Sequence, residues 1–165
     1  MAPDELGKLV DGHAAALVLY ARQWCASADD VVQDAFVKLF EQTAPVQKPV
    51  AWLYRVVRNG AISAARADDR RKAHRALMSR CTAVWFVPDR DAEIDPEEAE
   101  SALQALPLDE REVIVAHLWG GLTFAEIGDN AGYSSSTAHR LYASGLSRLR
   151  ERLGVICPKN RVNPI

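Results

Sequence analysis

The chain has 165 residues, enough for one ordinary domain or two very small ones and too few for a large multi-layer enzyme. Hydrophobic residues make up 48% and charged residues 25%, close to the globular average, which excludes a wholly disordered, collagen-like or disulfide-framework chain. The formal net charge is only −2, and that sum by itself gives no sign of a polyanionic partner.

The near-neutral sum conceals blocks of opposite charge, and electrostatic attraction depends on where charges lie. Residues 1–48 carry four bases and seven acids, a net −3, whereas residues 55–75 carry seven bases and two acids, a net +5. Residues 89–112 hold ten acids and two bases, a net −8, and residues 134–152 return to a net +3. Two basic blocks therefore alternate with two acidic ones.

Three amphipathic helices are predicted in the first half of the chain. Apolar residues between positions 6 and 24 recur at three- and four-residue steps, and strand-type alternation is absent. A second helix is expected from about Ser27, which we assign as its N-cap, and it ends before Pro45. A third helix begins at Pro49, a residue suited to a first turn, and continues as a basic segment to between 75 and 80.

The helical pattern breaks in residues 79–96, which we interpret as a flexible interdomain linker. They contain an apolar patch around Trp85 and Phe86, followed by Pro88, an acid run and Pro96. Exposed aromatic residues in a linker indicate docking on another surface. The alternative is that Trp85 and Phe86 fold back onto one of the chain's own domains.

The most specific local pattern of the chain lies at residues 122–142. Thr123 and Glu126 form a capping box, and Gly132 supplies a tight turn. Ser134 then caps a second helix whose small and apolar residues lie on one face. Two short helices joined by a glycine turn at this spacing predict a helix-turn-helix.

Two further helices are predicted before the helix-turn-helix, at about 96–105 and 109–118. The predicted fold class is therefore all-α, with two small helical domains joined by a flexible linker. The domains are expected at residues 1–78 and 97–153, and a flexible tail at residues 154–165.

The second helix of a helix-turn-helix enters the DNA major groove with its N-terminal residues at base edges. Arg140 is suited to a bidentate contact with guanine, worth about 1 to 3 kcal/mol of discrimination. Later arginines of the same helix suit phosphates, which position a protein without specifying sequence. The alternative is a helix pair that only packs and has a solvated basic face. The candidate duplex-DNA residues are Ser135, Ser136, Thr137, His139, Arg140 and Arg148.

Residues 52–75 form a second candidate surface, because Trp52 and Tyr54 accompany seven basic residues. Aromatic residues interleaved with Arg suit single-stranded nucleic acid, since bases stack on the rings while the cations neutralise phosphates. The alternative is that the aromatic residues belong to the protein core and the basic residues form a solvated helix face. The spacing of the residues is consistent with both interpretations.

Three stretches in this order resemble bacterial RNA polymerase sigma factors of the extracytoplasmic-function (ECF) group of the sigma-70 family. They are residues 28–36 (ADDVVQDAF), 51–59 (AWLYRVVRN) and 103–113 (LQALPLDEREV), the last leading into the helix-turn-helix. The resemblance spans about residues 5–153. It implies two helical domains and a protein that binds core RNA polymerase and directs promoter-specific transcription initiation.

The resemblance also implies a role for each stretch. The first would bind the clamp helices of the polymerase's largest subunit, and the second would recognise and help melt the −10 promoter element by capturing an unstacked base. The helix-turn-helix would bind the −35 element as duplex DNA. The implied polymerase-binding residues are Asp30, Gln33, Asp34 and Phe36, and the implied −10 residues are Trp52, Tyr54, Arg55, Arg58, Asn59, Arg66, Arg70 and Arg71.

No catalytic residue, cofactor or metal site is expected. Cys25, Cys81 and Cys157 are odd in number and far apart, and we interpret them as reduced thiols. The four histidines have no catalytic partner at a recognisable spacing. There is neither a signal peptide nor a run of about 18 apolar residues. The protein is therefore expected in the cytoplasm, at the nucleoid when bound to polymerase, and without membrane insertion.

Two alternatives to a sigma factor stay open at this point. A helix-turn-helix regulator with an N-terminal sensing or dimerisation domain predicts a palindromic operator and DNA binding without polymerase. A small hydrolase or nuclease would need a catalytic or metal-ligand set that the sequence does not offer. An anti-sigma factor or other inhibitory partner is also open. The acidic block at residues 89–112 is a hypothetical mask over the basic surfaces of the free protein.

Overall fold

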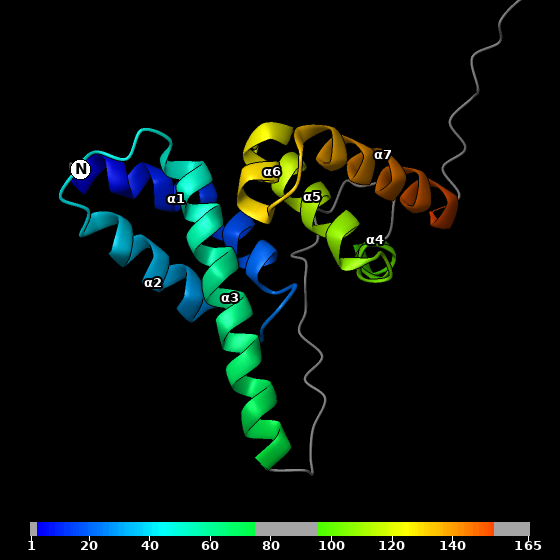
Figure 1. Cartoon of the computed structure of the whole chain (residues 1–165), viewed down its shortest axis with the longest axis horizontal. Helices are drawn as coiled ribbons and strands as arrows, with labels where there is room; N and C mark the ends of the chain where they lie inside the picture. Colours follow the sequence, from blue (N-terminus) through cyan, green and yellow to red (C-terminus); the bar gives the residue numbers. More distant parts are fainter. Residues whose placement is uncertain (1–2, 75–95, 154–165) are drawn as a thin grey trace, which may run out of the picture.

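The computed structural model describes residues 3–74 and 96–153, and these residues form seven α-helices with no strand among them. The predicted all-α fold class is confirmed (Figure 1). Most of the predicted linker, the Trp85 and Phe86 patch, Cys81, Cys157 and the predicted tail lie outside the described residues. The helices are α1 Pro3–Ala21, α2 Ala28–Phe40, α3 Pro49–His74, α4 Pro96–Gln104, α5 Leu108–Leu118, α6 Phe124–Ala131 and α7 Ser135–Arg152.

Helices α1, α2 and α3 pack against one another around a shared apolar core. The core side chains follow the predicted helical spacing and include Leu17, Val32, Leu39, Leu53 and Val57. At 26 residues, α3 is about 39 Å long, and it projects well beyond α1 and α2 (Figure 1). One long helix therefore supplies both a core face and an extended outer face.

The start of α2 differs from the prediction. Ser27 occupies the N-cap position, but its side chain makes no capping hydrogen bond, and its backbone (φ −88°, ψ 42°) is not the extended conformation typical of a cap. Asp29 and Asp30 lie in the first turn, where the helix dipole favours negative charge. Ser27 is therefore the N-cap residue, as predicted, but it does not cap α2 through its side chain. The start of α3 at Pro49 is as predicted.

Helices α5, α6 and α7 form the second packed unit, with α4 against α7. Val113, Ile114, Ile127 and Ala138 are buried at its centre. A Cβ atom at Gly145 would lie 2.6 Å from Cδ1 of Ile114 and 3.2 Å from Cβ of Glu110, so a larger residue would require these α5 side chains to shift. Helix α7 therefore packs closely on α5 at this position.

The two units also pack on each other, because α1 contacts α5 and α3 contacts α6. In Figure 1, α6 and α5 lie beside the upper part of α3 and the end of α1. The sequence predicted two domains joined by a flexible linker, and the only sign of this docking was the acidic block at residues 89–112, whose last residue, Glu112, contacts Arg58 of α3. The docking decides which candidate residues are accessible.

Candidate functional site

The turn between α6 and α7 has the geometry of a helix-turn-helix. Thr123 Oγ1 accepts a hydrogen bond from Glu126 N (3.3 Å), and Thr123 N donates to the Glu126 carboxylate (3.0 Å). Gly132 adopts φ +84°, the left-handed region in which glycine is favoured. Ser134 Oγ then accepts from Thr137 N (3.1 Å) at the start of α7. The predicted capping box, turn glycine and second cap are all confirmed.

An aromatic cluster fixes the angle between the helices on one side of this motif. The His117 ring stacks on Phe124 (centroids 4.5 Å apart), and its Nδ1 donates to the carbonyl oxygen of Leu122 (2.7 Å). The Tyr142 ring meets His117 edge-on at 4.9 Å. His139 lies edge-on to Phe124 at 5.1 Å while remaining exposed. His117 is therefore structural, and the His139 ring has a defined position on the outer face.

The candidate −35 residues gather at the N-terminal end of α7. At the start of the helix four of them are exposed, and Thr137 is half-buried with its hydroxyl 2.9 Å from Ser134 Oγ; Arg148, near the other end, is exposed as well. Arg148 lies three turns further along, where its Nε is 3.1 Å from Oε2 of the buried Glu110. Its charge is thus already partnered within the domain. The exposed four are Ser135, Ser136, His139 and Arg140.

The candidate −10 residues on α3 divide between two faces of the helix. Arg55, Asn59, Arg66 and Arg70 follow one another at steps of four, seven and four, which places them on one stripe, and all four are exposed. Arg71 also lies on α3, but its side chain is outside the described part of the chain. This stripe continues onto the C-terminal end of α3, which projects beyond α1 and α2 (Figure 1).

The other face of α3 is covered by α1 and α5. Tyr54 is completely buried, its ring 4.8 Å from that of Tyr20. A Cβ atom at Gly120 would lie 2.6 Å from Cζ of Tyr54, so the C-terminal domain presses directly on this ring. Burial raises the pKa of the Tyr54 hydroxyl, and that hydroxyl has no hydrogen-bond partner. The prediction that Tyr54 belongs to an accessible DNA surface does not hold in this conformation.

Arg58 is likewise engaged within the protein. Its Nε lies 2.6 Å from Oε1 of Glu112 on α5, and Nη2 lies 3.4 Å from Oε2. Tyr20 donates its hydroxyl hydrogen to the same Glu112 oxygen at 2.8 Å, and the Arg58 guanidinium lies 5.9 Å from the centre of the Trp24 ring. Burial and the negative charge of Glu112 raise the pKa of the Tyr20 hydroxyl. Trp52, the remaining candidate, is half-buried.

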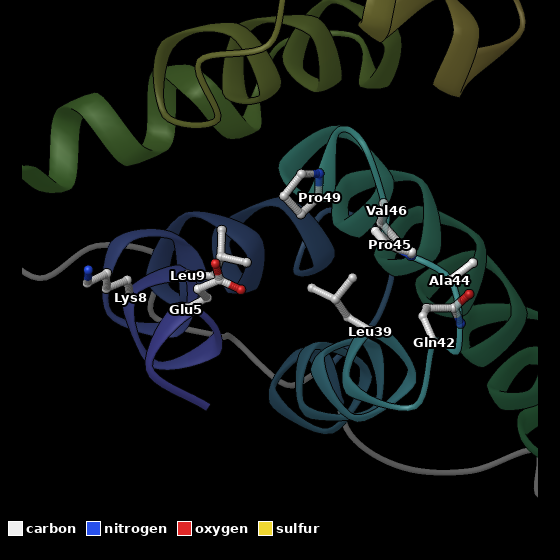
Figure 2. A pocket seen from close by; sticks show the side chains of 9 residues that line it. All are labelled: Glu5, Lys8, Leu9, Leu39, Gln42, Ala44, Pro45, Val46 and Pro49. Carbon is white, nitrogen blue, oxygen red and sulfur yellow. The ribbon is translucent and has the colours of Figure 1, made fainter. Parts of the chain in front are cut away.

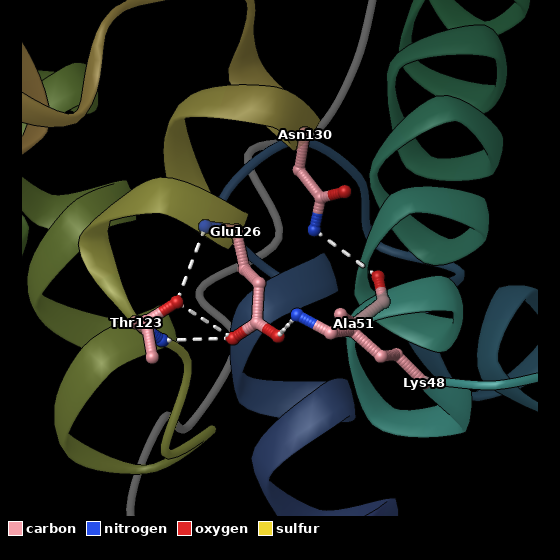
Figure 3. A network of polar contacts seen from close by, with 5 residues as sticks. All are labelled: Lys48, Ala51, Thr123, Glu126 and Asn130. Carbon is pink, nitrogen blue, oxygen red and sulfur yellow. Dashed lines mark hydrogen bonds and ion pairs between the residues drawn. The ribbon is translucent and has the colours of Figure 1, made fainter.

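Sequence reasoning missed Lys48, which lies in the loop directly before α3. Its Nζ is 2.8 Å from Oε1 of Glu126 on α6, and Asn130 Nδ2 donates to the backbone oxygen of Ala51 (3.1 Å), as Figure 3 shows. Hydrogen bonds from Lys48 and from Thr123 lower the pKa of Glu126 to about 2. The position of Lys48, a basic residue directly before the predicted helix start at Pro49, could have drawn attention to it. Nothing in the sequence indicated that its partner is Glu126.

A cavity of about 300 Å³ lies beside this contact. It brings Trp52 and Arg55 of α3 together with Lys48 and with polar side chains of α6. One wall therefore consists of candidate −10 residues and the opposite wall of the C-terminal domain. The lining residues are Val46, Gln47, Lys48, Ala51, Trp52, Arg55, Glu126, Asp129 and Asn130.

The candidate polymerase-binding residues border an apolar groove of about 590 Å³ between α1 and α2. Asp30, Gln33 and Asp34 are exposed, while Phe36 is buried at the groove wall. Phe40, the last residue of α2, is 53% exposed and lines this groove, and among the described residues no helix covers its side chain. The lining residues are Leu6, Val10, Ala14, Val18, Asp29, Val32, Gln33, Phe36, Val37, Phe40 and Glu41.

A second apolar cavity, of about 570 Å³, opens on the other side of α1 (Figure 2). It is formed by the start of α1, the end of α2 and the loop before α3, and charged Glu5 and Lys8 stand on its α1 side. None of the candidate residues lies in it. The lining residues are Glu5, Lys8, Leu9, Leu39, Gln42, Ala44, Pro45, Val46 and Pro49.

Within residues 3–74 and 96–153, no helix is both long and apolar enough to cross a membrane. The same residues contain no cluster of three or more His, Cys, Asp or Glu side chains that would hold a metal ion. Cys25 is a free, buried thiol whose pKa is raised by burial.

Comparison with known families and proteins matches both packed units. Residues 8–71 match the family described as Sigma-70 region 2, and residues 102–151 match Sigma-70, region 4. The chain is 29% identical over 132 residues to the RNA polymerase sigma factor CarQ of Myxococcus xanthus, covering 78% of this chain and 76% of CarQ. It is 29% identical over 133 residues to the ECF RNA polymerase sigma factor SigM of Mycobacterium tuberculosis, covering 78% of this chain and 65% of SigM.

Two solved structures share the fold. The sigma factor RpoE of Bartonella quintana, determined with the anti-sigma factor NepR, superposes with a TM-score of 0.73 at 23% identity over 94% of this chain and all of RpoE. CnrH, determined with the cytosolic domain of CnrY, has a TM-score of 0.55 at 24% identity over 94% of this chain and 92% of CnrH. The two family matches together cover more than half of the chain, in the order that the sequence resemblance predicted. The chain belongs to the sigma-70 family of RNA polymerase sigma factors, in its extracytoplasmic-function group.

Proposed function

We propose that this sigma factor contacts core RNA polymerase through α2, the −10 element through α3 and the −35 element through the start of α7. The observation that carries the assignment is the exposed stripe of Arg55, Asn59, Arg66 and Arg70 along α3. A row of cations and an amide on one helix face matches the spaced phosphates and base edges of a nucleic-acid strand. The three surfaces lie on three different helices, so no helix has to serve two of these partners.

The groove between α1 and α2 supports the polymerase contact. Exposed Val37 and Phe40 give it apolar area, and Asp30 and Asp34 place carboxylates beside that area. An apolar centre with a charged rim is the usual composition of a protein-binding surface. A basic, partly apolar helix from the largest polymerase subunit fits this chemistry.

For the −10 element, α3 would bind DNA that has lost its base pairing. Extruding a base costs a few kcal/mol, and a protein recovers that cost by stacking and hydrogen-bonding the extruded base. Trp52 supplies an aromatic face beside the cavity, and Arg55 and Asn59 supply charge and hydrogen bonds next to it. Binding the open strand in this way couples sequence recognition to strand opening.

For the −35 element, the first turns of α7 would lie in the major groove of duplex DNA. Ser135 and Ser136 are small enough for close approach, and exposed Arg140 is positioned to contact a guanine edge. His139, held against Phe124, would contact the backbone or a base from a fixed position. Arg148 would contribute to phosphate binding only after leaving Glu110.

The protein would act as a binding subunit in the cytoplasm, with catalysis left to the polymerase. RpoE and CnrH were each solved with an inhibitory or cytosolic partner, NepR or CnrY. A partner of that kind is therefore a further proposal for this chain. Its contact surface is not assigned.

The test is to add purified protein to core polymerase with genomic promoter fragments and to map the transcripts. Specific initiation at sites that share two spaced elements is expected. A protein that neither binds core polymerase nor redirects initiation would contradict the assignment. Binding of a palindromic operator without polymerase would instead favour the helix-turn-helix regulator.

A further inference from the structure

A series of ring contacts connects the interior of the C-terminal domain to the outer face of α7. The carbonyl oxygen of buried Leu122 accepts a hydrogen bond from His117 Nδ1, and the His117 ring stacks on Phe124. The Phe124 ring in turn meets the ring of exposed His139, with centroids 5.1 Å apart and an angle of 90° between the planes. This edge-to-face geometry is one of the two favoured for ring pairs. The contacts therefore lead from a fixed carbonyl oxygen to an exposed imidazole.

The Phe124 ring is itself held on several sides. Phe124 is the first residue of α6, directly after the capping-box residue Thr123, and it is half-buried against the domain core. The Tyr142 ring of α7 also packs on it, with centroids 5.4 Å apart. Rings from α5 and α7 thus contact Phe124 together, which leaves it little freedom to turn. It is a firm support for the exposed ring of His139.

His139 lies in the part of α7 that would meet the bases. It follows Ser135 by four residues, so the two exposed side chains share one side of the helix. In a helix-turn-helix the N-terminal residues of the second helix contact base edges, while the first helix crosses the DNA backbone. Phe124 is therefore placed where α6 approaches the backbone, and His139 where α7 enters the groove.

A fixed imidazole is of more use towards a base than towards a phosphate. Neutral imidazole has one donor and one acceptor nitrogen, and a base edge presents its donors and acceptors at set positions. Phosphate oxygens carry no sequence information, and a contact to them does not depend on which base pair is present. A free side chain would also lose rotamer freedom on binding, whereas His139 is already ordered by Phe124.

We propose that Phe124 is a specificity-determining positioning residue, which holds the His139 ring in one orientation so that His139 reads a single base pair of the duplex element. This inference rests on the proposed function of α7. Phe124 acts through His139 and reads no base itself. Removing either ring therefore has the same consequence for base preference, and removing both adds little to removing one.

The test uses the full-length protein and a duplex selected by the wild type from a pool of random sequence. The variants are Phe124→Leu, which keeps an apolar side chain at the core, His139→Ala, and the two combined. The matched control combines Phe124→Leu with Arg140→Ala, because Arg140 is the exposed neighbour of His139 on α7 but is not part of the series of rings. Phe124→Tyr keeps the ring and serves as the conservative variant. Phe124→Met replaces Phe124→Leu if the latter loses helicity by circular dichroism.

Affinity for the selected duplex is measured by fluorescence anisotropy, and base preference by repeating the measurement with each base pair changed in turn. Phe124→Leu and His139→Ala should each weaken binding about twofold to tenfold, the contribution of one ring pair. The combined variant should bind no more weakly than His139→Ala, because the two rings act as one unit. Both single variants should lose the preference at the same base pair, and Phe124→Tyr should retain it.

The combination of Phe124→Leu with Arg140→Ala should show the product of the two separate losses, since distant or unconnected contacts act independently. Equal coupling of Phe124 to His139 and to Arg140 would mean that the whole helix shifts, and it would overturn the positioning. So would a Phe124→Leu protein that keeps its base preference, or one whose loss of affinity is the same with and without His139.

Failure of the underlying function has a different signature. If the wild type enriches no sequence from the pool, or if His139→Ala and Arg140→Ala both bind the selected duplex as the wild type does, α7 does not read the major groove. Either result overturns the assignment of α7 and the positioning that depends on it. If both substitutions weaken binding while Phe124→Leu has no coupling to His139, α7 reads DNA and only the positioning is wrong.

Discussion

The two candidate DNA surfaces differ in how ready they are to bind. At the start of α7, four candidate residues are exposed and the local hydrogen bonds are satisfied within the motif. On α3, Tyr54 is fully buried and Arg58 is paired with Glu112, while only one stripe is exposed. The difference teaches that a basic helix face is available only where no other element of the same protein competes for it.

The positions of the two helices explain this difference. Helix α7 packs against α4, α5 and α6, and the outer face of its N-terminal turns is exposed to solvent. Helix α3 is the central helix of its domain and contacts α1, α2 and α6. Among the described helices, α1, α2 and α6 lie beside the first half of α3, and its other end projects beyond them (Figure 1). The candidate −35 surface is built by one domain alone, whereas access to the candidate −10 surface depends on both.

The largest expected effect concerns the exposed surface at the start of α7. Arg140→Glu should weaken binding of a −35 duplex by about tenfold to a hundredfold, because a base contact of about 1 to 3 kcal/mol is lost. Fluorescence anisotropy with the duplex would measure this change, and binding to core polymerase should stay intact. Equal loss of both activities would mean that the substitution unfolds the domain and that the comparison of surfaces is not being tested.

The next largest effect concerns the helix cap at the start of α7. Ser134→Ala removes the cap at the start of α7 and should lower the free energy of unfolding by about 1 kcal/mol. Chemical denaturation followed by circular dichroism would measure it. Ser27→Ala at the α2 start is the matched control, because that serine makes no capping hydrogen bond and its replacement should cost much less. Equal costs would show that the two caps do not differ.

A smaller change in stability, this time an increase, is expected at the buried face of α3. Tyr54→Phe removes a buried hydroxyl that has no partner and should stabilise the folded protein by about 1 kcal/mol. The thermal midpoint, followed by circular dichroism, should rise. A lower midpoint would mean that the Tyr54 hydroxyl has a hydrogen-bond partner in solution.

The smallest effect is a pH dependence of the contact at Lys48. The pKa of Glu126 is lowered to about 2 in the folded protein, chiefly by Lys48 and then by Thr123, while Asp129 lies nearby. A carboxyl group with a lowered pKa stabilises the fold above its unfolded pKa, near 4.5, and this contribution is lost as the pH falls towards 2. Because the pair is at the surface, the effect should be modest.

The measurement compares thermal midpoints of wild type and Glu126→Gln between about pH 6 and pH 2. Wild type should be the more stable at the upper end, and the two curves should converge as the pH falls through the range between 4.5 and 2. A difference that stays constant across this range would show that Glu126 carries no charge-dependent contact.

Local sequence signals predicted much of the fold. Pro49 marked a helix start, Thr123 with Glu126 marked another, and Gly132 with Ser134 marked the turn, because each acts on backbone groups within four residues. Ser27 was the exception, because the chain before α2 is not extended there. Apolar spacing also does not show which apolar residues stay exposed: Phe40 shares the pattern of α2 and is 53% exposed at its end.

The sequence by itself determined where the helices lie, which family the chain belongs to and which residues carry charge. Only the tertiary structure decided which of those charges are available. Arg58 and Glu112 are 54 residues apart, and Lys48 and Glu126 are 78 apart, so no local spacing relates them. Their pairing depends on the docking of two separately folded units. The net charge of −2 is therefore, in the folded protein, partly a set of contacts between acidic and basic surfaces of the same chain.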